Sequence, residues 1–253
     1  LRLANEGNGG DPTRLSVLLS KLLDGLSGPT FTRAAVPTVL LASDTVFADA
    51  LASGSLQRDG ARLLLNDPTV LEDSVLEEIQ RLGATHVTVL GGIDAISQAV
   101  EDALVDEGIT VDRLAGTTRI ETAIAVADAA GVDADVLLAR SHAAGDDPSQ
   151  AFADSLATGG WASGNGLPIY LTQTDRLTDS TASAFTTTQP DRTMVIGGTA
   201  AIADTVMEAI TDSGMSADRI HGSTRFATAT AVAEARGFTA DAPADRIVVV
   251  EGQ

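Results

Sequence analysis

One block of sequence occurs twice in this chain of 253 residues, and the duplication constrains the fold more than any other feature. Residues 113–127 (RLAGTTRIETAIAVA) match residues 219–233 (RIHGSTRFATATAVA) at nine of fifteen positions, at an offset of 106 residues. Two further pairs follow at nearly the same offset: 47–54 with 152–159, and 87–100 with 193–206. Three blocks repeated in one order at one period indicate an internal duplication.

The offsets predict two repeat units and the start of a third, over residues 1–112, 113–218 and 219–253. The leading block of the first unit is degenerate, with Arg2 and Arg14 at the matching places. The third unit contains a strand-like run at 246–250. An unfinished sheet edge is a template for pairing, so we expect this strand to pack on the second unit or to join another copy in an oligomer or filament.

Within a unit, short apolar runs alternate with segments of helical spacing. The runs that predict strands are 36–41, 61–65, 86–90 and 109–114, and the segments that predict helices are 46–57, 71–82 and 94–107. Continuous apolar strands between helices indicate parallel βαβ units with both sheet faces covered. The predicted fold class is therefore α/β, with tandem small doubly wound, Rossmann-like units.

The charge of the chain argues against nucleic acid as a partner. The chain carries 35 acidic and 16 basic residues, a formal net charge of −19, and such a field repels nucleic-acid backbones. Dense carboxylates with few lysines are also typical of proteins from halophilic or high-GC organisms. No apolar run approaches the roughly 20 residues that span a bilayer. An acidic chain that binds an anion must gather arginines locally.

Residues for catalysis are not grouped in this sequence. His86, His142 and His221 occupy unrelated repeat positions, and cysteine is absent. No motif for a zinc site or an activated nucleophile is present. We therefore predict no enzymatic activity, no cofactor and no metal site.

The leading block of each clear copy places an arginine where a helix begins. Residues 118–121 have the spacing of a capping box, which puts Arg119 at the first helical position, where a cation opposes the helix dipole. Arg225 occupies the same place in the second copy. An anion held between the arginine and free helix N–H groups would explain this choice. A structural ion pair with Asp49 or Asp154 would explain it equally well.

A second arginine precedes each of these by six residues, and a glycine lies between the two. The candidate ligand-binding residues are therefore Arg113, Arg119, Arg219, Arg225, Gly116 and Gly222. The glycine pairs 91–92 and 197–198 each end a strand before a helix. They could hold an anion through backbone N–H groups, or serve only as tight turns.

The motifs RLAG-x-x-R-x-x-TA, VLLA, FADAL-A-G and V-x-V-[LI]-GG-x-x-A-[IV]-S together resemble those of the cell-wall-binding repeat 2 family, over nearly the whole chain. The resemblance implies α/β modules, often three in tandem around a pseudo-threefold axis. It implies that they attach surface proteins noncovalently to anionic secondary cell-wall polymers, and that the four arginines bind the anion. The strand motif of the family falls on residues 63–65 and 169–171.

We therefore predict a non-catalytic, extracellular module at the cell wall or cell surface. It would bind an anionic cell-wall or surface polysaccharide and anchor a surface protein. Two alternatives stay open. The chain could be a structural subunit of a surface layer (S-layer) or filament, or it could be the targeting part of a wall-lytic amidase whose catalytic residues belong to another domain.

Overall fold

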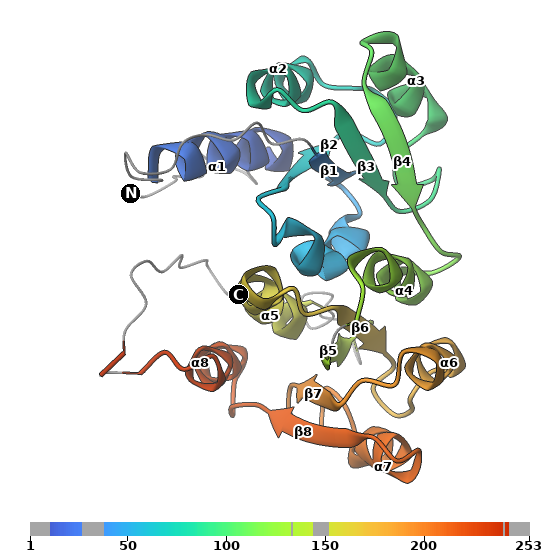
Figure 1. Ribbon diagram of the computed structural model, residues 1–253, viewed down its shortest axis with the longest axis vertical. Coiled ribbons are helices and arrows are strands. Elements are labelled where there is room, and N and C mark those ends of the chain that lie inside the picture. Colours follow the sequence, from blue (N-terminus) through green and yellow to red (C-terminus); the bar gives the residue numbers. More distant parts are fainter. Residues whose placement is uncertain (1–10, 27–37, 133, 144–151, 240, 243–253) are drawn as a thin grey trace. The chain divides into compact units, whose positions relative to one another are not determined.

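The computed structural model describes residues 11–26, 38–132, 134–143, 152–239 and 241–242 (Figure 1). They divide into two compact units, one within residues 1–50 and 59–115 and the other within residues 51–58 and 116–253. The boundary predicted between residues 112 and 113 falls inside a strand, β4 (Thr110–Leu114). The strand expected at 246–250, and the pairing expected of it, lie outside the described residues.

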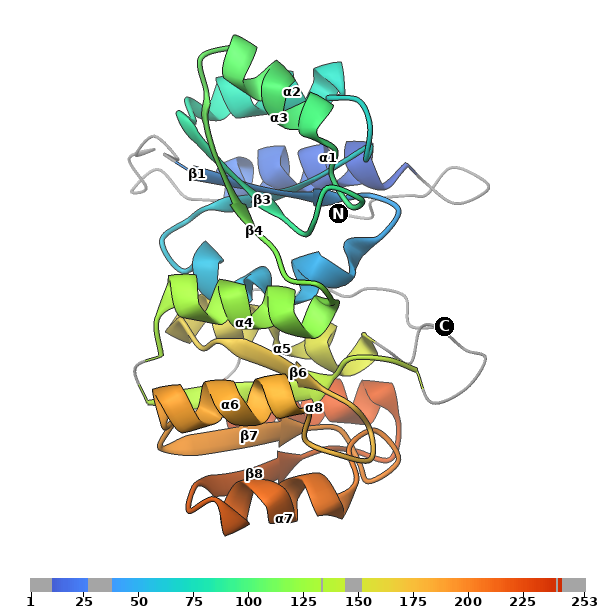
Figure 2. The ribbon, with the colours of Figure 1, turned by 90° about the vertical axis from the view of Figure 1, so that its right-hand side faces the viewer.

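The first unit is built on four parallel strands in the order β2-β1-β3-β4. Its elements in chain order are α1 (Pro12–Leu26), β1 (Thr38–Ser43), the 3-10 helix η1 (Phe47–Gln57), β2 (Arg62–Asn66), α2 (Asp73–Leu82), β3 (His86–Leu90), α3 (Gln98–Asp106) and β4 (Thr110–Leu114). The first turn of η1 belongs to this unit and the rest of it to the second. Helices α1, α2 and α3 lie on one side of the sheet (Figure 2) and share one apolar core with it.

The second unit repeats this topology, with parallel strands in the order β6-β5-β7-β8. Its elements are α4 (Arg119–Ala130), β5 (Asp135–Arg140), α5 (Ala153–Asn165), β6 (Ile169–Thr172), α6 (Asp179–Thr188), β7 (Arg192–Ile196), α7 (Asp204–Asp212), β8 (Ser216–Ile220) and α8 (Arg225–Ala235). Helices α4, α6 and α7 share a core on one face of the sheet, and α5 lies with α8 on the other (Figure 1). The predicted doubly wound α/β class is confirmed.

Burial of the strands explains their sequences. The central strands β1 (TVLLAS) and β5 (DVLLAR) are buried over five successive residues, as expected for strands of a parallel sheet that are covered on both faces. The edge strands β4 (TVDRL) and β8 (SADRI) are more exposed and more polar, whereas β6 (IYLT), at the opposite edge of the second sheet, is buried throughout. Composition therefore distinguishes β4 and β8 from the central strands, but it does not distinguish β6.

Two predicted helices differ from the observed ones, one in its start and the other in its type. The helix expected over 94–107 begins only at Gln98, because the preceding residues form a turn in which the Ser97 N–H donates to the Pro68 carbonyl at 2.7 Å. The second unit repeats this contact between Ala203 and Thr174, also at 2.7 Å. The segment expected as a helix over 46–57 is a 3-10 helix, whereas its counterpart α5 is an α-helix.

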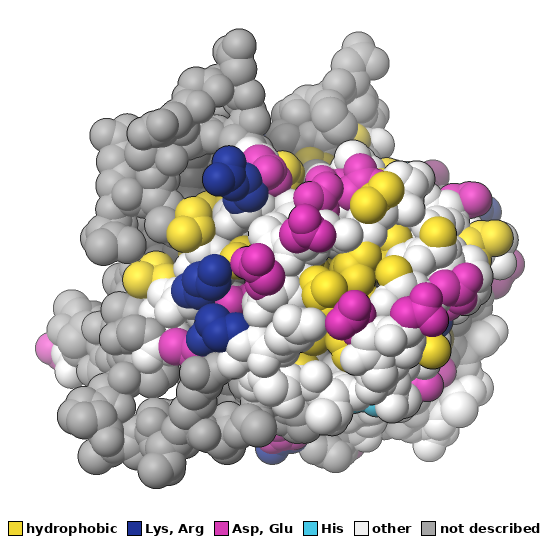
Figure 3. Space-filling model, turned by 90° about the horizontal axis from the view of Figure 1, so that it is seen from above, with side chains coloured by type: hydrophobic (Ala, Val, Ile, Leu, Met, Phe, Trp, Pro, Cys, Tyr) yellow, Lys and Arg dark blue, Asp and Glu magenta, His cyan; other side chains and the backbone are white. Residues whose placement is uncertain are grey.

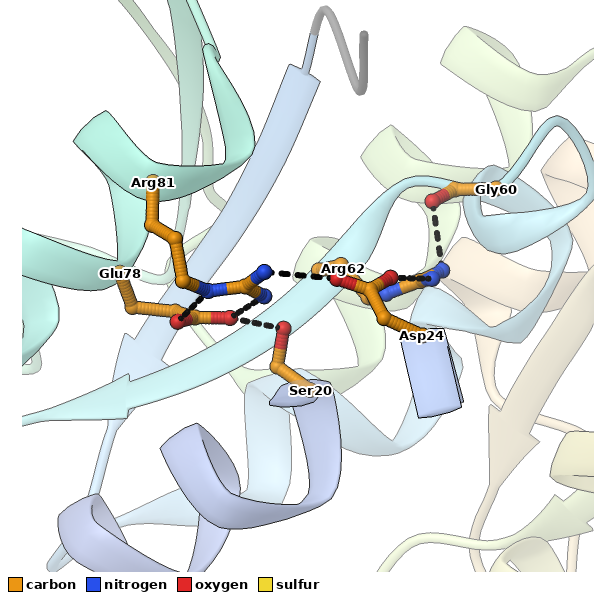
Figure 4. Close-up of polar contacts among 6 residues, drawn as sticks. All are labelled: Ser20, Asp24, Gly60, Arg62, Glu78 and Arg81. Atoms are coloured by element: carbon orange, nitrogen blue, oxygen red, sulfur yellow. Dashed lines mark hydrogen bonds and ion pairs between the residues drawn. The ribbon is translucent and has the colours of Figure 1, made fainter. Parts of the chain in front are cut away.

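Helix α1 was not predicted, and charged contacts hold it to its unit (Figure 4). The fully buried Glu78 of α2 accepts hydrogen bonds from Ser20 Oγ at 2.5 Å and from Arg81 Nε at 2.6 Å. Arg81 also donates to Asp24 at 2.7 Å, and Arg62 of β2 donates to the other oxygen of Asp24 at 3.2 Å. Burial alone would raise the pKa of Asp24, but the hydrogen bonds from both arginines outweigh it and hold that pKa below its ordinary value.

The two faces of α1 are the reverse of those expected for a helix on a core. Its packed face carries Val17 among the hydroxyl residues Thr13, Ser16 and Ser20, whereas its exposed large apolar residues are Leu15, Leu18, Leu19 and Leu23. Ser16 Oγ accepts the Leu65 N–H at 3.0 Å, so α1 also covers the edge strand β2. Because of this reversal, the spacing of apolar residues does not show which face of α1 packs on the core.

The excess of acid is visible on the molecular surface. Figure 3 shows one face of the molecule, on which acidic side chains surround an apolar area and a few basic side chains lie together at one side. A surface of this kind repels anions over most of its area. Any anion site must then lie where arginines gather.

Candidate functional site

The repeated motifs meet at the carboxyl ends of the strands, because parallel strands all end at the same edge of a sheet. In the second unit, Ser141 and His142 follow β5, the Gly197-Gly198 turn follows β7, and Gly222 lies between β8 and α8. In the first unit, the Gly91-Gly92 turn follows β3 in the same way. We take the second unit's edge as the candidate site, since it contains the larger number of the predicted residues.

The first glycine of each pair is required by close packing. Gly91 and Gly197 have φ angles of 99° and 110°, which disfavour any residue with a side chain. A Cβ on Gly197 would lie 2.6 Å from Asp154 Oδ2, and a Cβ on Gly91 would overlap the carboxylate of Asp49. The N–H groups of the two glycines donate to the last residues of β4 and β8, both at 2.9 Å. The described contacts therefore favour the tight-turn interpretation for these first glycines.

Arg113 and Arg219 support the same turns. Arg113 Nη1 donates to the Gly91 carbonyl at 2.6 Å, and its Nε pairs with Glu101 at 2.8 Å. Arg219 Nη1 donates to the Gly197 carbonyl at 2.8 Å and its Nη2 pairs with Asp204 at 3.0 Å. Binding of a ligand by these two arginines stays a prediction, but their described contacts are structural. They fix the glycine turn to the edge strand.

Gly116 and Gly222 also have a structural use. The loop passes so close to the first turn of the following helix that a Cβ on Gly116 would overlap Glu121, and one on Gly222 would overlap Ala227. The N–H of each glycine donates to a threonine hydroxyl six residues later, at 3.1 Å in both copies. These N–H groups are therefore engaged, and a contact with a ligand stays a prediction.

Arg119 and Arg225 lie at the first helical position, as the capping pattern predicted. At the start of α4, the Thr118 N–H donates to Glu121 Oε2 at 2.7 Å. Hydrogen bonds with Thr118 hold the pKa of Glu121 below its ordinary value. At the start of α8, Thr224 Oγ1 accepts an N–H from the first turn at 3.2 Å. Both helices thus begin with a cap and an arginine.

Arg119 reaches the end of the central strand of the second sheet. Its Nη1 donates to the Ser141 carbonyl at 3.1 Å, and Ser141 Oγ lies 2.8 Å from His142 Nδ1. Burial, and then the positive charge of Arg119, lower the pKa of His142. The imidazole is therefore neutral at pH 7, and Arg119 carries the charge at this point of the edge.

Sequence reasoning missed Arg140, the last residue of β5. Its side chain is 8% exposed, and it stands where the first unit has Ser43. Burial raises the pKa of Asp154, and the charges of Arg140 and Arg225 lower it without offsetting that effect. The signal for Arg140 was available, because VLLARS in the second unit replaces VLLASD in the first.

The structure thus brings Arg119, Arg219 and Arg225 to one edge and adds Arg140 to them, whereas Arg113 belongs to the first unit. Asp154 and Asp204 are acidic neighbours there, and Glu121 lies in the first turn of α4 beside Arg119. The strand motif lies elsewhere: residues 169–171 are at most 1% exposed within β6. An arginine-rich edge of this kind can bind a phosphate or carboxylate.

Asp154→Asn tests the electrostatics of this edge. Because the folded pKa of Asp154 is raised, its stability contribution is full below the unfolded pKa of roughly 4 and is lost as pH rises through the folded value. The variant should therefore melt a few degrees higher than the wild type near pH 7 and should lose this advantage near pH 3. Thermal melts at both pH values measure this, with Asp212→Asn, an exposed aspartate on α7, as control. A variant that melts lower near pH 7 would show that Asp154 is a stabilising partner of the arginines.

The described residues also bear on other kinds of site. Within them, no group of three or more His, Cys, Asp and Glu side chains is placed to hold a metal ion. None of the helices in the described part of the chain is both long and apolar enough to cross a membrane. His86, outside the candidate site, pairs with Asp112 at 3.1 Å.

Comparison with curated proteins finds two relatives from Bacillus subtilis (strain 168). The chain is 27% identical over 190 residues to the N-acetylmuramoyl-L-alanine amidase LytC and 27% identical over 190 residues to the amidase enhancer. The match covers 75% of this chain in both cases, but only 36% of the amidase and 24% of the enhancer. The chain therefore corresponds to a part of each relative.

Solved structures share the fold. Cwp6 from Clostridium difficile superposes with a TM-score of 0.75 at 20% identity, over 89% of this chain and 34% of that protein. Cwp8 from the same organism superposes with a TM-score of 0.70 at 21% identity, over 88% and 36%. The sequence model of cell wall binding domain 2 (CWB2) matches residues 8–101 and 113–207, one stretch for each repeat. The predicted resemblance is thereby confirmed, and the chain belongs to the cell wall binding domain 2 family.

Proposed function

We propose that this chain is a non-catalytic module that holds an anionic cell-wall polymer at the carboxyl edge of its second sheet. The family match carries the proposal: it covers both repeats and includes Arg113 and Arg119, and the internal duplication extends the assignment to Arg219 and Arg225, which follow the matched residues. Such a module acts outside the cell, at the cell wall or cell surface, as the anchor of a larger protein. The chain itself takes no part in a reaction.

Local charge supports the choice of edge. The net charge of −19 repels an anion from most of the surface, so binding needs a place where arginines prevail. Arg119 and Arg225 each begin a helix, where N–H groups and the helix dipole also favour an anion. Arg219 near the end of β8 and the buried Arg140 at the end of β5 add positive charge to the same edge. We assign direct contact to Arg119 and Arg225 and a positioning role to Arg219, whereas Arg113 supports the corresponding glycine turn of the first unit.

The names of the curated relatives favour a compatible second candidate, the targeting part of a wall-lytic protein. One relative is an amidase and the other an amidase enhancer, and this chain corresponds to about a third or less of each. In this case the lytic activity lies in a region other than the repeats, and the chain supplies only attachment. The two candidates share one site and differ in the protein that the site anchors.

Cosedimentation with purified cell walls tests the proposal. We expect the chain to sediment with intact walls, to bind walls stripped of their anionic polymers at least tenfold more weakly, and to be released as the salt concentration rises, because ion pairs with an exposed polymer are screened. Free anionic polymer should compete. Equal binding to intact and stripped walls, with no effect of salt, would contradict an anionic ligand. Release of wall fragments by the purified chain would contradict a non-catalytic role.

A further inference from the structure

Helices α5 and α8 of the second unit pack side by side in the same direction. At their N-terminal ends, the charge of Arg225 acts on Asp154. At the other end of α8, the guanidinium of Arg236 lies against Gly160 and Gly164 of α5. Both ends of α8 thus meet the matching ends of α5, and an arginine stands at each end.

The contact at the C-terminal end is tightest at Gly160. A Cβ on Gly160 would lie 3.1 Å from Arg236 Nη1, closer than most side-chain contacts, whereas a Cβ on Gly164 would lie 3.6 Å from Nη2, an ordinary van der Waals distance. Glycine inside a helix lowers its stability relative to alanine, so two glycines one turn apart on one face need a reason. The space that they leave, which we name the glycine notch, accommodates the flat guanidinium.

Electrostatics explain why an arginine occupies the notch. Two helices packed in the same direction bring their C-terminal ends together, and each end carries a partial negative charge. Arg236 follows the last residue of α8 and lies beside the last turns of α5. Its positive charge therefore offsets the partial negative charge at the C-terminal ends of both helices. Its guanidinium also lies 4.8 Å from the centre of the Phe238 ring. None of the ion pairs found in the described part of the chain involves Arg236, and burial lowers its pKa.

The duplication supplies a comparison within the same chain. At the repeat offset of 106 residues, Arg236 corresponds to Ala130, the last residue of α4, and at the offset of 105, Gly160 corresponds to Ser55. The second copy of this helix pair therefore combines Arg236 with Gly160, whereas the first copy has Ala130 and Ser55 at the same two positions. A large side chain on one helix is matched by a missing side chain on its neighbour.

We propose that the glycine notch of Gly160 and Gly164 is an interaction surface that selects its partner helix by an arginine at that helix's C-terminal end. Arg236 identifies α8, the opening helix of the third repeat, as the partner of α5. The corresponding helix α4, which carries Ala130 at this position, lacks the group that fills the notch. Pairing between successive repeats is thereby specific, which limits misassembly in a chain of similar units.

Hydrogen exchange of the intact chain, followed by mass spectrometry over α8, tests the proposal. Arg236→Ala and Gly160→Leu should each reduce the protection of α8 amides roughly fivefold, as expected for the loss of one partly buried charge–dipole contact. The double variant should lose little more than either single variant, because both changes remove the same contact. Gly159→Ala is the matched control, since a Cβ there meets open space, and it should not reduce protection.

Two results would overturn the proposal. Losses that add in the double variant would show that Arg236 stabilises α8 alone and that the notch does not hold it. If the α8 amides of Arg236→Ala are as protected as those of the wild type, the arginine does not stabilise the packing of α8 on α5. Circular dichroism of each variant separates local release of α8 from global unfolding, and none of these substitutions touches Arg119.

Discussion

Replacing Arg119 and Arg225 together by alanine is expected to weaken binding to anionic wall polymer about a hundredfold or more. A hydrogen bond to a charged group contributes roughly 1.5–3 kcal/mol, and each factor of ten in affinity corresponds to about 1.4 kcal/mol. Both arginines stand at helix starts on the arginine-rich edge of the second sheet. The loss should be largest at low salt, where attraction between exposed charges is least screened.

The matched control removes two cations that lie away from this edge. Arg192 begins β7, at the amino end of the same sheet, and pairs with Asp135 at 2.5 Å, while the exposed Lys21 lies on α1 of the first unit. The Lys21→Ala/Arg192→Ala variant has the same net charge as the site variant, so a general charge effect would weaken both equally. Equilibrium binding to purified polymer and thermal melts should be measured on the two variants side by side.

The same pair of measurements distinguishes ligand binding from a structural role. Arg119 donates to the Ser141 carbonyl, and the charge of Arg225 acts on Asp154, so both side chains also have partners within the protein. A site variant that stays folded and loses binding supports the proposed function. A site variant that unfolds, with unchanged binding per folded molecule, would assign the arginines to structure and remove the basis of the proposal.

Glu78→Gln should destabilise the first unit by about 3 kcal/mol. Removing one partner of a buried ion pair leaves the other charge uncompensated, which typically costs about 3–5 kcal/mol. The lower end applies here, because the Arg81 side chain is 30% exposed and keeps its contact with Asp24. The carboxylate of Glu78 is fully buried and also accepts the Ser20 hydroxyl of α1 (Figure 4), so α1 should loosen first.

Urea unfolding measures this prediction, and the neighbouring residue supplies the control. Glu77 is exposed on the same turn of α2, so Glu77→Gln makes the same chemical change outside the network and should alter stability by less than about 0.5 kcal/mol. Equal stability of the two variants would mean that water compensates Arg81 as well as Glu78 does. Faster exchange of α1 amides in Glu78→Gln alone would locate the loss at the contact between α1 and α2.

Several features of this protein follow from sequence alone, because they depend on local spacing or on duplication. The order of apolar runs predicted parallel sheets, whose central strands β1 and β5 are buried over five successive residues. The capping residues at 118–121 predicted that a helix begins at Arg119, since a cap needs only neighbours in the chain. The repeat offset then predicted the same start for α8 at Arg225, on a segment with a weaker pattern of its own.

Tertiary structure decided which arginine meets which partner. The strand order places β1 beside β3, and β5 beside β7, so the Asp154 carboxylate meets the turn at Gly197 across 43 residues of chain, and Arg140 joins it from β5. Spacing could not separate Arg219, whose donors bind a carbonyl and Asp204, from Arg225, which begins a helix. Sequence sets local conformation through neighbouring residues, whereas the partner of a charged side chain depends on which distant strands become adjacent.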